Sequence, residues 1–572
     1  MKVIKICILS LLVGLNLTSC DFLDKEPTKT TSNNYFKNEA EAYSFLTGTY
    51  AILGQSSFYG NSYLFLIGGD DLQHYGGVGR SPYKSGLICN NANSSDPDVA
   101  AFWYTLYSGI NRANIFLENI DAVPDMNDDN RKQYRAEARF LRAFYYFNLV
   151  ECWGDVPFKT SSTQDVNGLA IPRTDKEIIY DFIVKEMYGA ANELKSSREL
   201  NYLPGRVSKS AAWGILARVY LFRAGEHHRD KKVADDVKVK EYFKQASHYA
   251  QMVTKEGHDL VDNYWDVFID LCSDKYNSTG KNESIWEIEF AGNRSTDVRA
   301  EGRIGNIIGI PAPDLSANTA MTGKADPGYS YSFIYSTPKL LDIYEANGDI
   351  NRCNWSIAPF TYGQSNGVGT AVDFRQFEYG KKAQVANQYD YKSFTYAGDK
   401  EKTEVQSKKD RARACGKYRR EYEKDKKSKN DTPINFPVLR YADVLLMIAE
   451  AENEVNGGPN ALAYQSINAV RKRAGIRELS GLSQKDFRNA IKDERAMELC
   501  FEYTRRFDLI RWGDYVNNMN LLVERAKSGE DWTQGPSNVY AYFQISDTYN
   551  YFPIPAAEIA VNSEITKNNP GW

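Results

Sequence analysis

Apolar residues recur at the 3.6-residue spacing of an amphipathic helix in several parts of the chain. Residues 135–158 show this most clearly, with apolar side chains at i, i+3, i+4 and i+7 on one face. These side chains are Phe140, Ala143, Phe144 and Phe147. Gly154 and Pro157 then predict the end of that helix. The same spacing predicts helices over 174–194, 208–225, 240–257, 439–458, 461–475 and 486–502. The 174–194 helix opens on a capping-box pattern, Thr174 followed by Glu177.

Some of the predicted helices have the spacing of tetratricopeptide helix pairs. The first helix of such a pair has a large ring, then a leucine, a small residue and a tyrosine 3, 4 and 7 positions later. Trp213, Leu216, Ala217 and Tyr220 match this pattern. Small and apolar residues at offsets 0, 4 and 7 fit the second helix of such a pair, in Ala246, Ala250 and Val253 and again in Ala463, Ile467 and Val470. Because one pair cannot bury its apolar face alone, we expect the pairs to stack on neighbours. An unrelated helical bundle is the alternative, since the repeat is degenerate.

Helical spacing fades between about 261 and 436, where Gly, Asn and Tyr are frequent. Residues 283–290 alternate in the manner of a strand. Long irregular segments inside a compact protein are usually functional. The sequence therefore predicts a mainly α fold, a tetratricopeptide-like helix-pair scaffold with a large loop-rich insertion and a few short strands.

The first residues have the pattern of a secretory signal peptide. Lys2 and Lys5 flank the start of a ten-residue apolar run, Ile6 to Leu15, which is too short to span ~30 Å of hydrocarbon. Cys20 follows Leu17, Thr18 and Ser19 in an order similar to a bacterial lipobox, where signal peptidase cuts before a cysteine that carries diacylglycerol.

We therefore expect residues 1–19 to be a signal peptide and residues 20–34 a lipid-anchored tether. Several acyl chains on Cys20 would anchor the protein stably, whereas a single chain would not. An ordinary signal peptide with a chance cysteine is the alternative. No later run of about 18 apolar residues is present, so we expect the mature protein to be tethered to a membrane without crossing it.

Composition describes a globular protein with polar aromatic surfaces. Apolar residues make up 42%, charged residues 25%, and the formal charge is −4. This balance does not suggest nucleic-acid binding. Tyrosine outnumbers phenylalanine 39 to 27, so many rings have one polar edge.

Cysteine spacing excludes the common metal and disulfide patterns. Two of the eight cysteines, Cys7 and Cys20, belong to the predicted signal and anchor. The other six are far apart and form no CxxC pair, so we expect isolated buried thiols. They are Cys89, Cys152, Cys272, Cys353, Cys415 and Cys500.

Segments spread over nearly the whole chain resemble the SusD/RagB family, in the order of that family. The resemblance begins with the lipobox, "DFLDKEP" and "YFKNEAEAYSFLTGTYAIL" (35–53). It continues through "FWYTLYSGINRANIFLENI" (102–120), "RAEARFLRAFYYFNLVECWGDVPF" (135–158), "GRVSKSAAWGILARVYLF" (205–222) and "FPVLRYADVLLMIAEAENEVNG" (436–457). It ends with "RAMELCFEYTRRFDLIRWG" (495–513), "YFPIPAAEIAVN" (551–562) and "NPGW" (569–572).

The resemblance implies an outer-membrane lipoprotein that faces outward and caps a SusC-like TonB-dependent transporter. Its implied partners are that transporter, an oligosaccharide and, through Cys20, membrane lipid, with no nucleic acid. A peptide ligand, as in RagB-like members, is the alternative. The implied organisation is a helical tetratricopeptide-like region at 35–260, the loop-rich aromatic region at 261–436 and a helical C-terminal region at 437–572. Asp21, Asp24 and Glu26 are similar to acidic surface-export signals of such lipoproteins.

The residues that match the family belong to its scaffold. We expect Arg139, Arg142, Asp443 and Glu450, which stand among apolar residues on helices, to form buried ion pairs. Ligand contacts are expected in the loops, where aromatic faces cover sugar CH patches and planar polar groups bind hydroxyls. The candidate ligand-binding residues are Asp70, Asp71, His74, Tyr75, Arg80, Tyr83, Tyr329, Tyr331, Trp355 and Tyr362.

A basic run at 408–429 has 11 Lys and Arg against 4 Asp and Glu. A solvated loop or a transporter-facing surface explains it, and an anionic-glycan site is the alternative.

Enzyme motifs are weak. Gly363–Gly367 spells GxSxG, yet none of the five histidines follows Ser365, as a hydrolase would require. We expect a protein that is not an enzyme and needs no cofactor. Structural calcium stays open, although EF-hand spacing is missing.

Overall fold

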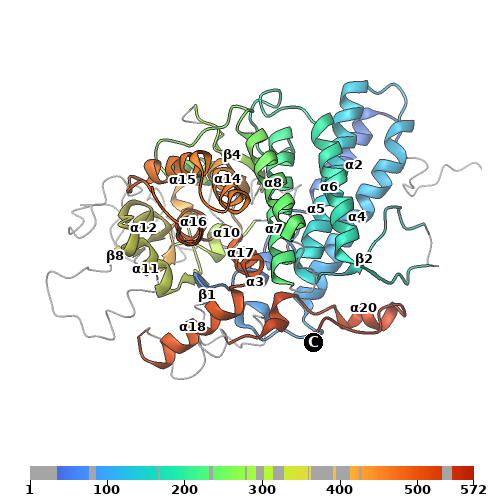
Figure 1. Ribbon diagram of the computed structural model, residues 1–572. Coiled ribbons are helices and arrows are strands. Elements are labelled where there is room, and N and C mark those ends of the chain that lie inside the picture. Colours follow the sequence, from blue (N-terminus) through green and yellow to red (C-terminus); the bar gives the residue numbers. More distant parts are fainter. Residues whose placement is uncertain are drawn as a thin grey trace, which may run out of the picture.

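The computed structural model describes residues 35–75, 86–164, 168–230, 236–276, 280–291, 302–312, 328–358, 360–362, 391–393, 413–423, 428–530 and 544–572 (Figure 1). The fold is mainly α, as predicted. The N-terminal helices are α2 (Glu39–Tyr50), α3 (Ser62–Leu66), α4 (Pro97–Asn119), α5 (Asp128–Trp153), α6 (Lys176–Glu193), α7 (Lys209–Arg229) and α8 (Asp236–Val253). Four shorter helices follow, α9 (Asp266–Cys272), α10 (Ile304–Ile307), α11 (Pro338–Asn347) and α12 (Ile350–Ser356). The C-terminal helices are α14 (Tyr441–Asn456), α15 (Ala461–Ala474), α16 (Gln484–Leu499), α17 (Arg505–Trp512), α18 (Tyr515–Lys527) and α20 (Ala556–Val561).

Local sequence signals explain where the long helices begin and end. Asn127 caps α5 by accepting hydrogen bonds from the amides of Asp129 and Asn130, and Gly154, at φ +70°, ends it. Helix α6 is capped by the Asp175 side chain, so the predicted capping box at Thr174 is wrong by one residue. Thr174 is instead the last residue of strand β3 (Arg173–Thr174).

Helix α7 passes through Gly225, where the sequence predicted its end. A Cβ at Gly225 would lie 2.4 Å from the backbone oxygen of Arg511. This glycine therefore permits close packing of α7 on α17 rather than ending the helix.

The helices pack as neighbouring pairs that join distant parts of the chain. Helix α5 packs on α6, α7 on α8, α8 on α14, and α14 on α15 (Figure 1). The Trp213 and Tyr249 rings stack 5.4 Å apart across α7 and α8. The predicted small residues at the second-helix positions, such as Ala246 and Ala463, are fully buried. A tetratricopeptide-like scaffold is therefore what these helices build.

Short strands complete the fold. Strands β1 (Gln73–Tyr75), β5 (Ile334–Ser336), β9 (Ala414–Cys415) and β6 (Ile357–Ala358) form a four-stranded antiparallel sheet in that order. The strand predicted at 283–290 is β4 (Ser284–Ile288), paired with β10 (Phe436–Arg440). Two further pairs are β2 (Val156–Pro157) with β3, and β7 (Phe360–Tyr362) with β8 (Tyr391–Ser393).

One apolar core connects all three predicted regions. It contains Leu46 of α2, Trp286 of β4 and Phe501, which follows α16. Trp286 stands edge-on to the Phe140 and Phe144 rings of α5, at centroid distances of 5.3 and 4.8 Å. The region boundaries at 260 and 436 stay predictions.

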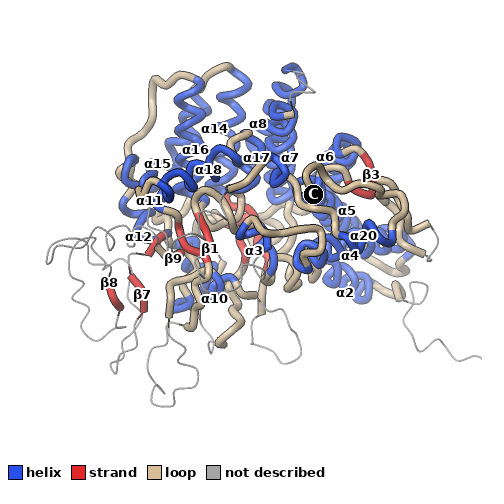
Figure 2. Tube along the Cα trace, turned by 90° about the horizontal axis from the view of Figure 1, so that it is seen from below, coloured by secondary structure: helices blue, strands red, loops and turns tan. Residues whose placement is uncertain are grey.

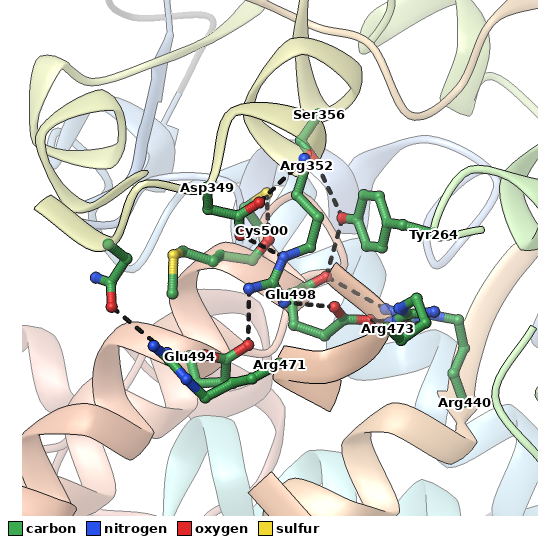
Figure 3. Close-up of polar contacts among 12 residues, drawn as sticks. Tyr264, Asp349, Arg352, Ser356, Arg440, Arg471, Arg473, Glu494, Glu498 and Cys500 are labelled. Carbon is green, nitrogen blue, oxygen red and sulfur yellow. Dashed lines mark hydrogen bonds and ion pairs between the residues drawn. The ribbon is translucent and has the colours of Figure 1, made fainter. Parts of the chain in front are cut away.

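A buried network of charges fixes the loop-rich region to α16 (Figure 3). Arg352 of α12 pairs with Asp349, Glu494 and Glu498, at 2.5, 2.7 and 2.8 Å. Arg440 of β10 also pairs with Glu498, at 3.2 Å. Burial alone would raise the pKa of Glu498, yet the guanidinium groups around it hold that pKa well below its usual range. Because every member is buried, the network specifies how these elements dock, and loss of one partner would be costly.

The predicted scaffold ion pairs are confirmed. Arg142 and Arg139 both bind Glu186, at 2.6 and 3.2 Å. Asp443 binds Arg495 and Arg218, at 2.7 and 2.8 Å. The Glu450 carboxylate accepts a hydrogen bond from Nη2 of Arg511, at 2.8 Å.

Residues 413–423 of the basic run lie largely inside the protein, whereas Lys429 at its end is exposed. Arg413, Lys417, Arg419 and Arg420 are at most 3% exposed. Lys417 binds Glu502 at 2.6 Å, and Arg420 binds Glu423 at 2.7 Å. For residues 413–423, therefore, neither the solvated-loop interpretation nor the anionic-glycan interpretation holds.

Five of the predicted isolated thiols are described as free and buried, Cys152, Cys272, Cys353, Cys415 and Cys500. No helix in the described ranges has both the length and the apolar character needed to cross a membrane.

Candidate functional site

A row of aromatic side chains lies half-exposed along the segment that leads into β5. Tyr329, Tyr331 and Phe333 alternate with the buried Ser330 and Ser332. Ser332 has φ +49°, so this backbone is not regularly extended, and it is the contacts between neighbouring rings that place the three on one side. Together with Phe65 of α3 and Tyr75 of β1 they form what we call the aromatic strip.

Backbone hydrogen bonds hold the strip against α10. The amide of Tyr331 donates to the carbonyl of Asn306 at 2.9 Å, and the amide of Phe333 donates to Ile307 at 2.8 Å. Strand pairing sets Tyr75 opposite Ile334, immediately after Phe333. In Figure 2, α10 lies at the lower edge of the molecule, and the long helices α14 and α8 lie at the upper edge. The strip is thus fixed on the loop-rich side.

The rings form a continuous contact series. Tyr329 meets Tyr331 edge-on at 4.6 Å, and Tyr331 stacks on Phe333 at 4.9 Å with an interplanar angle of 13°. Phe333 lies 6.0 Å from Phe65 and 6.1 Å from Tyr75. These distances are typical of favourable aromatic pairs, so each ring fixes the orientation of the next.

Polar groups border the Tyr329 end of the strip. The Asn306 side chain donates to the carbonyl oxygens of Lys429 and Tyr329, at 2.8 and 3.4 Å. Its Oδ1 accepts from Arg303 at 3.0 Å. The ammonium of Lys429 lies 5.5 Å from the centroid of the Tyr329 ring. Rigid rings beside charged and amide groups are what sugar binding requires.

His74 precedes Tyr75 on β1 and lies opposite Tyr335. Burial lowers the pKa of His74 to about 4. Its imidazole is therefore neutral at neutral pH, so His74 adds hydrogen-bonding capacity and no charge.

Asp70 and Asp71 do not lie on the ligand-facing surface that the sequence predicted for them. Both are buried, at 1% and 0% exposure. Asp71 binds Arg505 and Lys339, at 2.8 and 2.6 Å. Asp70 accepts hydrogen bonds from the amides of Leu72 and Gln73, at 2.8 and 3.1 Å, and so shapes the turn into β1. These two carboxylates position the strand that holds Tyr75.

Trp355 must also be removed from the predicted platform. It is fully buried, and the Arg419 guanidinium lies 3.9 Å from its ring centroid. Trp265 and Tyr422 pack nearby, with centroids at 6.4 and 6.3 Å. A ring enclosed in this way offers no face to a sugar.

Other candidates are only partly described. Arg80 and Tyr83, like Cys20 and the GxSxG segment, lie outside the described residues. Tyr362 ends β7 and pairs with Tyr391 of β8, and for these two strands the structure describes the backbone alone. Of the ten predicted ligand residues, the structure brings Tyr75, Tyr329 and Tyr331 together, whereas His74, the neighbour of Tyr75 in β1, points to the other face of the strand.

Sequence reasoning missed Phe333, Phe65 and Arg303, whereas Lys429 belongs to the basic run at 408–429, for which an anionic-glycan site was the alternative. The alternation in "YSYSFIY" (329–335) was the signal that could have found Phe333, because rings at every second position indicate one face of extended backbone. No comparable pattern marks Phe65 or Arg303.

A metal centre is not evident in the ranges described here, because no group of three or more His, Cys, Asp or Glu side chains there could hold a metal ion.

A model of the SusD family matches residues 282–572, which is more than half of the chain. The chain belongs to the SusD family. A second family model, described as "Starch-binding associating with outer membrane", matches residues 21–221 of this SusD-family chain.

Relatives of this SusD-family chain align over most of its length. It is similar to SusD-like protein P25 of Formosa agariphila, with 27% identity over 100% of this chain and 99% of that protein. It is 25% identical to the starch-binding protein SusD of Bacteroides thetaiotaomicron, over 80% of this chain and 76% of that protein. The crystal structure of a SusD homologue from Bacteroides thetaiotaomicron matches with a TM-score of 0.76 and 26% identity, covering 96% of this chain and 100% of that one.

Proposed function

We propose that this SusD-family chain is a non-catalytic glycan-binding lipoprotein of the outer membrane. The observation that carries the proposal is the aromatic strip, a fixed series of half-exposed rings on the loop-rich side of the scaffold. The family model described as starch-binding and associating with the outer membrane supports the same function. The relative named starch-binding protein SusD supports it too.

The strip suits the chemistry of sugar recognition. Pyranose rings present flat CH patches that pack on aromatic faces. Tyr329 and Tyr331 each combine such a face with a hydroxyl group that can bind sugar hydroxyls. Because backbone hydrogen bonds to α10 fix Tyr331 and Phe333, little conformational entropy is lost when the ligand binds.

Anchoring and delivery complete the proposal. Lipid on Cys20 would hold the protein at the outer face of the outer membrane. A SusC-like TonB-dependent transporter would receive the captured oligosaccharide, as the family resemblance implies. No cofactor is part of this proposal. A structural calcium ion bound in a loop would not change it.

Native affinity electrophoresis of residues 21–572 tests the proposal. The panel contains neutral plant and microbial polysaccharides, mucin glycans, and sulfated or uronic-acid polymers, each assayed also for release of reducing ends. We expect retardation by at least one class without release of reducing ends. Hydrolysis of any polymer would contradict the non-catalytic role.

Co-purification tests the transporter partner. Affinity capture of the lipidated protein from its native membrane should retain a TonB-dependent transporter together with bound sugar. Bound peptide, with no retardation by any glycan, would replace the proposal with peptide capture.

A further inference from the structure

Arg303 is a fixed cation beside the aromatic strip that forms no ion pair with any described residue. Its guanidinium donates to three neutral acceptors, the Asn430 carbonyl at 3.3 Å, Asn61 Oδ1 at 3.4 Å and Asn306 Oδ1 at 3.0 Å. These bonds use three of the five N–H donors of the group. The amide contacts hold the guanidinium in place, and no described carboxylate compensates its charge.

Nearby arginines differ in this respect. Arg420, whose Nη1 donates to the Tyr329 carbonyl at 2.6 Å, directs Nε and Nη2 to the carboxylate of Glu423 at 2.7 and 3.1 Å. Arg352 and Arg440 each bind several carboxylates in the core. Arg303 has neutral acceptors alone among the described residues, like the buried Arg506, but it is half-exposed and can therefore bind an external anion.

Arg303 and the strip are connected through one side chain. Asn306 accepts from Arg303 and donates to the carbonyl oxygens of Tyr329 and Lys429. Lys429 is exposed, and its ammonium lies 5.5 Å from the Tyr329 ring centroid. Residues 428–435 hold one base, Lys429, and one acid, Asp431, so Arg303 is the cation beyond that balance among the described residues at this end.

We infer that the Tyr329 end of the strip binds an anionic group of the glycan, either the carboxylate of a uronic acid or a sulfate ester, with Arg303 as the specificity-determining residue. This inference rests on the proposed function, since it names the class of glycan. The planar guanidinium matches carboxylate and sulfate oxygens in a way that an ammonium does not. The rings then bind the neutral face of the same or the next sugar.

Paired polymers that differ mainly in charge test the inference. One pair is polygalacturonate and its fully methyl-esterified form, and the other is dextran sulfate and dextran. Isothermal titration of residues 21–572 at 50 and 300 mM NaCl should give at least about tenfold tighter binding for the acidic member of one pair. The pair that responds distinguishes the uronate from the sulfate ester.

Variants distinguish the Arg303 site from general attraction of polyanions. We expect Arg303→Gln to weaken acidic-polymer binding about tenfold and neutral-polymer binding less than twofold. Arg303→Lys should recover part of the loss, and the exposed Lys429→Gln should cost about two- to threefold. Arg112→Gln is the matched control, because Arg112 is an exposed α4 arginine that donates to the Gly48 carbonyl at 2.7 Å. It should change neither affinity.

Two results would overturn the inference in distinguishable ways. If neutral polymers bind, lose affinity with Tyr331→Ala and show no preference for charge, the anionic site is wrong and the proposed function stands. If neither pair binds at either salt concentration but a neutral glycan of the electrophoresis panel does, the inference fails alone; if nothing binds in either experiment, the proposed function and this inference both fail. If Arg303→Gln does not fold, the Lys429→Gln and Arg303→Lys titrations decide, and unchanged acidic-polymer affinity in both would reject the site.

Discussion

The Asp71 carboxylate accepts hydrogen bonds from Nε and Nη2 of Arg505, at 2.8 and 2.9 Å, although 434 positions separate the two residues in the sequence. Lys339 of α11 binds the same carboxylate at 2.6 Å. Asp71 thus joins the turn before β1 to two helices from later parts of the chain. Because β1 carries Tyr75, this ion cluster holds one side of the aromatic strip in place.

We predict that Asp71→Asn destabilises the protein by about 3 kcal/mol, because two cations would then be buried without their carboxylate. Urea unfolding followed by tryptophan fluorescence measures the change. Asp121→Asn is the control, because Asp121 is 68% exposed in its pair with Arg135 and should cost less than about 1 kcal/mol. Equal effects of the two substitutions would contradict the structural role of Asp71.

The neighbouring carboxylates Asp70 and Asp71 should give opposite pH dependences. Burial and the charge of Asp71 raise the pKa of Asp70 to about 8. The pKa of Asp70 is higher in the folded protein than its unfolded value of 3.8. The contribution of Asp70 to the free energy of unfolding is therefore fully present below about pH 4 and is lost as pH rises to about 8. The stability of Asp70→Asn relative to wild type should therefore increase as pH rises through that window. Above about pH 8 the difference should stay constant.

Asp71 behaves in the reverse sense. Burial alone would raise its pKa, but Arg505 and Lys339 lower it well below the usual range. Its stabilising contribution is present above about pH 4 and is lost in stronger acid, so the deficit of Asp71→Asn should shrink there. Thermal unfolding from pH 3 to pH 9 measures both trends, and parallel curves for the two variants would refute the assignment.

Close packing around Trp355 can be tested with glycines. A Cβ at Gly416 would lie 2.0 Å from the Trp355 carbonyl oxygen, so we expect Gly416→Ala to destabilise the protein by about 1–3 kcal/mol. Nothing lies within 4 Å of a Cβ at Gly458, so Gly458→Ala should be neutral or slightly stabilising. Chemical denaturation of both variants checks this, and a neutral Gly416→Ala would contradict the close approach of the Gly416 and Trp355 backbones.

The predicted lipid anchor has its own test. Cys20→Ala should leave the protein soluble or mislocalised, because Cys20 is the predicted attachment point of the lipid. Membrane fractionation and metabolic labelling with a tagged fatty acid measure the effect. Full retention in the outer membrane without label would mean that a protein partner supplies the anchor.

Periodicity was enough to predict the long helices, since amphipathic spacing and Asn or Gly caps are local properties. Long-range pairing was not predictable in the same way. Lys417 and Arg420 suggested a solvated or ligand-binding run because Glu502, the partner of Lys417, lies 85 residues away. The ring of Trp355 is likewise buried by contacts from Arg419 and Trp265, which no local pattern reveals.

For the site, the sequence indicated the right ring types but not which faces are exposed. Tyr329 and Tyr331 were found because they stand in an aromatic, turn-rich segment. Asp70 and Asp71 were misplaced because a carboxylate in a loop looks the same in sequence whether it binds a ligand or Arg505.

The most direct test of the central claim is the affinity of Tyr331→Ala for the polysaccharide that retards the wild-type protein. Tyr104→Ala is the matched control, because Tyr104 is a 41% exposed ring on α4 outside the strip. Isothermal titration should show at least about a tenfold loss for Tyr331→Ala, on the order of 1.4 kcal/mol, and no change for Tyr104→Ala. Unchanged affinity of a correctly folded Tyr331→Ala protein would contradict the claim that the strip binds the glycan.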